Sequence, residues 1–163
     1  MRKLNTLLFL LLVLAFQQGK AQTKIIPVVN FKSLSTYIQP SADTLKIVNF
    51  WATWCHPCVE EMKYFKEAGD NYANQKVKFI FVSLDYKSKK DHVEEFWEKN
   101  KIKGDIYILD DNPNIWINQV DSSWGGEIPY TLIVSSNGKQ IKINRALKNY
   151  KDLQSLINNN LTK

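Results

Sequence analysis

The sequence contains only two cysteines and two histidines among its 163 residues. Two cysteines are too few for the disulfide framework of a small secreted domain, which needs four or more. A structural zinc site takes four ligands, and His92 has no spacing that matches the cysteines, so zinc is disfavoured. Covalent haem attachment needs a histidine directly after the second cysteine, where this chain has Val59. We therefore expect no metal and no cofactor.

Glycine and proline are also scarce, with six and five residues, and no repeat or low-complexity tract follows residue 21. This composition excludes a collagen-like protein, and 44% apolar residues disfavour wholesale disorder. The length allows one domain, which we place at residues 22–163. An unbroken apolar run of ten residues, 7–16, would rise about 15 Å as a helix, which is half of a bilayer core.

The first 21 residues predict a secretory signal peptide. A basic start (Arg2, Lys3) precedes the apolar run, and small residues stand before the expected cleavage site after Ala21. An uncleaved anchor is the weaker reading, and membrane contact is expected only through this segment. Removal of its three basic residues lowers the net charge from +6 to +3. Interspersed charges of both signs then give no reason to expect nucleic-acid binding. The predicted location is outside the cytosol, in the periplasm.

Apolar β-prone runs predict strands, and apolar residues three and four positions apart predict helices. The predicted strands are residues 23–30 (an edge, because of Pro27), 45–51, 77–84, 106–109, 130–135 and 139–143. The last two flank Asn137-Gly138, a hairpin turn. Helices are predicted over residues 31–39, from the cysteines to Tyr72, after an N-cap at Ser88, and over 153–161. This order predicts an α/β fold whose central mixed sheet is parallel first and ends in an antiparallel hairpin.

The two cysteines lie at the junction between a buried strand and a helix, in the segment Trp51-Ala-Thr-Trp-Cys-His-Pro-Cys58. At a helix N-terminus, free N–H groups and the helix dipole stabilise a thiolate, the species that attacks disulfides. Cys55 is therefore the predicted nucleophile and Cys58, one turn inward, the resolving thiol. Pro57 suits the first helical turn. A purely structural disulfide is disfavoured, because a four-residue loop removes little chain entropy.

His56 is the residue next to the nucleophile, where a charged or hydrogen-bonding imidazole would favour the thiolate of Cys55. A solvent-exposed spacer with little effect is the alternative for this histidine. Trp54 is expected to shield Cys55, and a packing role is equally compatible with the sequence.

The chain resembles the thioredoxin superfamily, and more narrowly its exported TlpA/ResA-like branch of thiol-disulfide oxidoreductases. The resemblance rests on Phe50-Trp-Ala-Thr-Trp-Cys-His-Pro-Cys58, on Ile128-Pro-Tyr-Thr-Leu132 and on the Asn137-Gly138 hairpin, and it covers residues 24–163. It implies a thioredoxin fold flanked by helices. It also implies a cis bond before Pro129, with the backbone of Ile128 pairing with an extended substrate segment.

The resemblance also implies an acid/base residue. Many thioredoxins have a buried Asp where this chain has Asn49, which cannot accept a proton. In the exported branch a Glu three residues after the second cysteine takes part in proton chemistry, and Glu61 occupies that position. The alternative is that Glu60 and Glu61 form a solvated face that stabilises the first turn of the helix.

These features predict an exported protein-disulfide reductase with a redox-active Cys55–Cys58 pair. The expected partners are client proteins that carry disulfides or thiols, and a membrane-linked thiol donor; the resemblance suggests a role in cytochrome c maturation. A peroxidase is disfavoured, because Ala52 stands where peroxiredoxins have Thr, and no proline lies between Pro40 and Pro57. A non-catalytic binding module or chaperone that uses the same groove is the third alternative.

Overall fold

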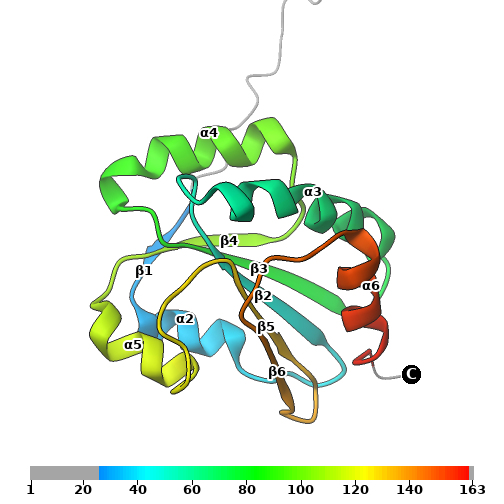
Figure 1. The fold of residues 1–163 in the computed structure, drawn as a ribbon. Coiled ribbons are helices and arrows are strands. Elements are labelled where there is room, and N and C mark those ends of the chain that lie inside the picture. Colours follow the sequence, from blue (N-terminus) through cyan, green and yellow to red (C-terminus); the bar gives the residue numbers. More distant parts are fainter. Residues whose placement is uncertain (1–25, 162–163) are drawn as a thin grey trace, which may run out of the picture.

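A computed structural model describes residues 26–161, which form a six-stranded sheet with helices on both faces (Figure 1). The strands are β1 (Val28–Val29), β2 (Leu45–Trp51), β3 (Val77–Ser83), β4 (Asp105–Leu109), β5 (Tyr130–Val134) and β6 (Gln140–Ile143). The helices are α2 (Phe31–Ile38), α3 (His56–Asn71), α4 (Lys90–Asn100), α5 (Pro113–Val120) and α6 (Tyr150–Asn158), with the short 3-10 helix η1 (Lys87–Lys89) before α4.

The spatial order of the strands is β1-β4-β3-β2-β5-β6. Strand β2 pairs with β3 in parallel over seven residues and with β5 antiparallel over five. The first four strands in this order are parallel, and β5 and β6 form the antiparallel end. The register places Phe50 opposite Tyr130. The carboxyl end of β2 therefore lies beside the start of β5.

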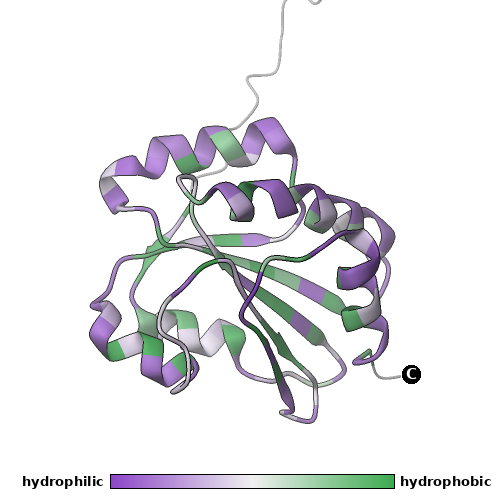
Figure 2. Ribbon diagram, in the orientation of Figure 1, coloured by the Kyte–Doolittle hydropathy of each residue, from purple (hydrophilic) through white to green (hydrophobic). Residues whose placement is uncertain are grey.

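Alternate side chains of the central strands enter two separate cores, as the period of a β-strand requires. Ile47 and Trp51 of β2 pack with α3, α4 and α6 on one face of the sheet. Val48 and Phe50 pack with α2 and α5 on the other face. Figure 2 shows the corresponding concentration of hydrophobic residues along the central strands, while the outward sides of α3 and α4 are mainly hydrophilic. Burial on both faces explains why β2 and β3 read as continuous apolar runs.

The predicted mixed sheet and the C-terminal hairpin are confirmed, and Pro27 stands beside an edge strand, because β1 pairs only with β4. Two details of the prediction are wrong. Helix α4 begins at Lys90 after a 3-10 turn and has no side-chain N-cap, so Ser88 does not cap it. The last helix ends at Asn158, short of Leu161.

Helix α5 is absent from the prediction. Asn112 caps it by accepting a hydrogen bond from the N–H of Asn114, and Pro113 occupies its first turn. Only two of its eight residues, Trp116 and Val120, are buried, so the segment offers too short an apolar pattern to be recognised as a helix.

The predicted signal peptide, residues 1–21, lies outside the described residues. Within residues 26–161, no helix combines the length and the apolar character that crossing a bilayer requires.

Candidate redox site

Cys55 and Cys58 form a disulfide at the N-terminus of α3. Cys55 is the N-cap residue, and its Cα lies 5.2 Å from that of Cys58. Pro57 stands in the first turn, where its lack of an N–H leaves no helical hydrogen bond unmade. Cys55 is 6% exposed and Cys58 is completely buried. Cys55 is therefore the sulfur that an external partner can reach first, as the sequence predicts.

The loop before β5 faces the first cysteine. The bond between Ile128 and Pro129 is cis, and the Ile128 carbonyl oxygen lies 3.7 Å from the Cys55 sulfur. The indole N–H of Trp124 donates to the Glu127 carbonyl (2.7 Å), and the Tyr130 hydroxyl donates to Asp121 (2.9 Å). These buried contacts hold the loop on both sides of Ile128. The structure thus brings Ile128 and Pro129 against Cys55, 73 positions earlier in the chain.

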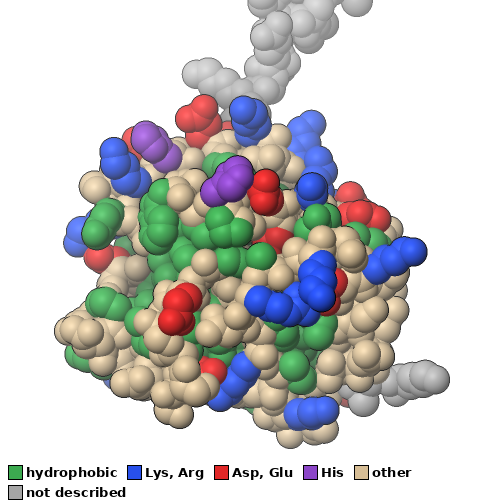
Figure 3. Space-filling model, viewed as in Figure 1, with side chains coloured by type: hydrophobic (Ala, Val, Ile, Leu, Met, Phe, Trp, Pro, Cys, Tyr) green, Lys and Arg blue, Asp and Glu red, His purple; other side chains and the backbone are tan. Residues whose placement is uncertain are grey.

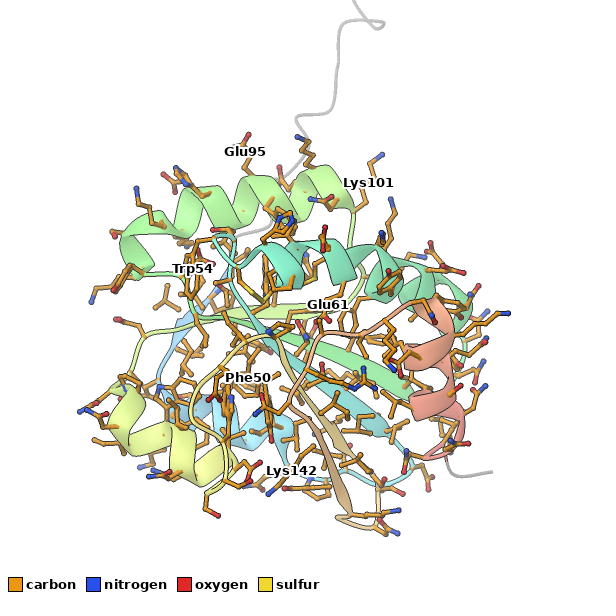
Figure 4. All side chains as sticks on the ribbon, in the orientation of Figure 1. Phe50, Trp54, Glu61, Glu95, Lys101 and Lys142 are labelled. Carbon is orange, nitrogen blue, oxygen red and sulfur yellow. A yellow bond between two sulfur atoms is a disulfide. The ribbon has the colours of Figure 1, made fainter. Side chains whose placement is uncertain are left out.

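The side chain of Glu61 lies between α3 and the sheet (Figure 4) and is 1% exposed. One carboxyl oxygen accepts a hydrogen bond from Asn49 Nδ2 (2.9 Å) and the other from the Leu147 N–H (2.8 Å). Asn49 Nδ2 also donates to the Thr131 hydroxyl, while its Oδ1 is buried without a hydrogen-bond partner. The solvated face considered for Glu61 is therefore wrong, although Glu60 is exposed.

Burial raises the pKa of Glu61 from its ordinary value of 4.5 to about 7. The hydrogen bonds from Leu147 and Asn49 and the positive charge of Arg145 oppose this shift, but burial outweighs them. A carboxyl with this pKa is divided between its protonated and ionised forms near neutral pH. Glu61 can therefore both accept and return a proton one helical turn from Cys58.

The remaining predicted site residues lie at the surface of the motif. Trp54 is 67% exposed and projects from the turn between β2 and α3 (Figure 4). The His56 imidazole is exposed and lies 3.2 Å from the Glu60 carboxylate, one turn along α3. Trp51, by contrast, is completely buried. The two tryptophans of the motif thus have different positions, one in the core and one in solvent beside Cys55.

Sequence reasoning missed Asp85, which holds the turn that precedes Cys55. Its carboxylate is 3% exposed and accepts hydrogen bonds from the N–H (2.9 Å) and hydroxyl (2.5 Å) of Thr53 and from the Ser83 hydroxyl (2.7 Å). The signal was an acidic residue directly after a buried strand, since the carboxyl ends of parallel strands meet at one edge. Asp85 fixes the backbone two residues before the nucleophile.

Residues 26–161 contain no group of three or more His, Cys, Asp or Glu side chains placed to hold a metal ion. The chemistry that this site offers is that of the dithiol itself. Cys55, the more accessible sulfur, can exchange with an external disulfide at the helix N-terminus, and the fully buried Cys58 can close the ring.

Residues 32–153 match the family described as Redoxin. The chain is 35% identical over 97 residues to "Thiol-disulfide oxidoreductase ResA" of Geobacillus thermodenitrificans, covering 59% of this chain and 51% of that protein. It spans about half the length of the first curated relatives that it matches. Among solved structures it is similar to a thioredoxin-related protein from Neisseria meningitidis serogroup B, with a TM-score of 0.63, 22% identity, and coverage of 76% of this chain and 88% of that one.

A second solved structure, a thiol:disulfide interchange protein of Chlorobium tepidum, gives a TM-score of 0.63 at 18% identity and covers 87% of this chain and all of that one. These likenesses show the thioredoxin fold. Because the family match extends over most of the sequence, the chain belongs to the Redoxin family.

Proposed function

We propose that the protein is an exported thiol-disulfide oxidoreductase that reduces disulfides of client proteins through Cys55 and Cys58. The observation that carries the proposal is the Cys55–Cys58 disulfide at the start of α3, with the Ile128 carbonyl at 3.7 Å and the buried Glu61 one turn along the helix. Relatives named thiol-disulfide oxidoreductases support the same activity.

In the reduced protein, the Cys55 thiolate attacks one sulfur of a client disulfide, and the second client sulfur leaves as a thiolate. A mixed disulfide then joins Cys55 to the client. Glu61 takes the proton of Cys58, whose thiolate attacks the Cys55 sulfur and releases the first client sulfur. The client gains two electrons and two protons, one of them returned by Glu61, and the protein retains the Cys55–Cys58 disulfide. His56 and the dipole of α3 favour the Cys55 thiolate at the first step.

An extended client segment would pair with the backbone of Ile128 beside Cys55. Within residues 26–161, neither the N–H nor the carbonyl of Ile128 takes part in a backbone hydrogen bond, so the N–H can donate to such a segment and the carbonyl can accept from it. We place the protein in the periplasm, where a membrane-linked thiol donor returns the pair to the dithiol. Cytochrome c maturation is the process that the resemblance suggests for its clients.

The test is a Cys58→Ser trap in the exporting cell. Without the resolving thiol, mixed disulfides through Cys55 accumulate and disappear on treatment with dithiothreitol. The matched control is Cys55→Ser, which keeps Cys58 but loses the accessible nucleophile. Equal adduct levels in the two variants would refute the exchange mechanism, and survival of the biological activity in the double variant would favour a binding module.

A redox titration of the purified protein decides the direction of the reaction. A potential near about −270 mV supports a reductant, and one near about −120 mV supports an oxidant. A peroxidase would instead convert hydrogen peroxide at a rate that depends on Cys55.

A further inference from the structure

A hollow of about 260 Å³ lies next to the redox site, where the carboxyl ends of β3 and β4 meet the start of α5. Leu84, Leu109 and Ile117 contribute apolar walls, and Asp110 and Asp111 lie along its edge. Figure 3 shows hydrophobic side chains gathered on the part of this face between α4 and α5, with acidic side chains beside them. The hollow is therefore apolar inside, and its rim carries two carboxylates, one of which pairs with Lys87.

Two contacts connect this hollow to the catalytic groups. Asp85 belongs to its lining and accepts the hydrogen bond from the Thr53 N–H, two residues before Cys55. Gly126 also belongs to the lining and precedes Ile128 by two residues. Gly126 has φ of +94°, a backbone conformation that favours glycine, and it lies close to α5, since a Cβ on it would be 2.9 Å from Ile117 Cδ1.

The spacing of a β-strand relates the two places. A client strand that pairs with the backbone at Ile128 presents its cysteine to Cys55. Client residues two positions away lie about 7 Å along the strand and point to the same side. One such residue would stand opposite Gly126, which lines the hollow, and the direction of the client strand decides whether it precedes or follows the cysteine.

The charges around the hollow select the chemistry of that residue. Lys87 pairs with Asp110 (2.9 Å), and the Asp111 carboxylate accepts the N–H groups of Phe31 (2.9 Å) and Asn112 (2.7 Å). Glu127, next to Ile128, is also exposed and adds a carboxylate to the loop before β5. A side chain with a long aliphatic stem and a cationic head fits such a surface, because the stem covers the apolar walls and the cation meets the rim.

The exposed ring of Tyr86 favours arginine over lysine. Tyr86 lines the hollow and is 81% exposed, so its ring can stack with an incoming planar cation. A guanidinium stacks on an aromatic ring and binds a carboxylate with two parallel hydrogen bonds, which an ammonium group does not.

We propose that this hollow is a client subsite that takes a basic side chain, arginine above lysine, two residues from the client cysteine. The inference rests on the proposed function, since it presupposes a client whose cysteine reacts with Cys55. It adds a recognition element that the sequence motif does not contain, because its walls come from the ends of β3 and β4 and from α5.

The experiment uses the reduced protein and synthetic peptides that each carry one cysteine as a mixed disulfide with glutathione. Two residues before or after that cysteine, the peptides carry arginine, lysine, citrulline or glutamate. Citrulline keeps the shape of arginine without its charge. Single-turnover reduction is quenched with acid and followed by mass spectrometry.

With arginine in one of the two positions, we expect the peptide to react about fivefold faster than the citrulline peptide. This is the rate ratio that one partly exposed charge pair would produce. Asp110→Asn and Asp111→Asn should each reduce this ratio towards one. Asp70→Asn is the matched control. It removes an exposed carboxylate of α3 that pairs with Lys103, and it should leave the ratio unchanged. Since Asp111 also accepts the Phe31 N–H, Asp110→Asn keeps the test valid if Asp111→Asn unfolds.

Equal rates for the arginine and citrulline peptides in both positions would overturn the subsite while leaving the proposed function intact. Preservation of the arginine preference in Asp110→Asn would overturn the assignment to this hollow. If neither these peptides nor oxidised glutathione is reduced, the proposed function itself fails, and the subsite fails with it.

Discussion

Replacement of Glu61 by glutamine should remove a pH dependence from the stability of the oxidised protein. Folding raises the pKa of this carboxyl from 4.5 to about 7, so between these values the folded state binds more protons than the unfolded state. The free energy of unfolding therefore falls as the pH rises through this window. A pKa shift of this size corresponds to about 3 kcal/mol of unfolding free energy. This loss of stability is complete above pH 7 and absent below pH 4.5.

The structure also indicates that glutamine fits this position. Its side-chain oxygen can accept the Leu147 N–H, and its amide can donate to Asn49 Oδ1, which has no partner in the native arrangement. This arrangement requires the Asn49 side-chain amide to rotate by 180°, which exchanges its Oδ1 and Nδ2. The Thr131 hydroxyl, which accepts from Nδ2 in the native protein, then donates to Oδ1. The substitution should therefore remove the charge while the number of unpaired buried atoms on Asn49 stays at one, with Nδ2 now in the place of Oδ1.

The assay is urea unfolding of the oxidised protein between pH 4.5 and 8, with fluorescence of the buried tryptophans as the signal. Across this range, the unfolding free energy of the wild type should fall by about 3 kcal/mol relative to that of Glu61→Gln. Glu60→Gln, which changes the exposed neighbouring carboxyl, is the control and should follow the wild-type profile. A difference between Glu61→Gln and wild type that stays constant with pH would refute the reasoning.

A second measurement tests Glu61, and two further substitutions test other parts of the molecule. Glu61→Gln should also change the pH profile of thiol alkylation in the reduced protein, measured with iodoacetamide; an unchanged profile removes the proposed role in proton transfer. Asp85→Ala should lower the free energy of unfolding by about 1–3 kcal/mol, because it leaves Thr53 and Ser83 groups without an acceptor, whereas Asp85→Asn should cost less. Phe65→Ala, which removes a completely buried ring of α3, should lower the free energy of unfolding by about 3–5 kcal/mol in urea unfolding. A loss below about 1 kcal/mol would contradict the packing described.

The sequence was sufficient for features that depend on local pattern. The strand-to-helix junction was predicted correctly from two local features. These are the apolar run that forms β2 and the spacing of the two cysteines after it. Glu61 could be singled out only through the resemblance, because its burial depends on Leu147, 86 positions later, and on Asn49 in the adjacent strand. No local pattern contains these contacts.

Other parts could not be predicted for different physical reasons. The prediction of an N-cap at Ser88 was wrong because the chain forms a 3-10 turn before α4. A serine three residues before an acid is compatible with a helix N-cap and with a 3-10 turn. The position of Asp85 after a buried strand marks it in the sequence, but nothing local names the group that its carboxylate accepts from. Only the parallel pairing of β2 with β3 brings it within hydrogen-bond distance of Thr53.

The arrangement of β2 between β3 and β5 has a consequence for when the protein becomes reactive. The groups around Cys55 come from three chain segments, and the contact with Ile128 spans 73 residues. Such a contact requires the closure of a long loop, which costs conformational entropy. While the chain is extended, Cys55 has neither a helix terminus nor the Ile128 carbonyl beside it. The surroundings that distinguish Cys55 from an ordinary thiol are therefore present only once β5 has paired with β2.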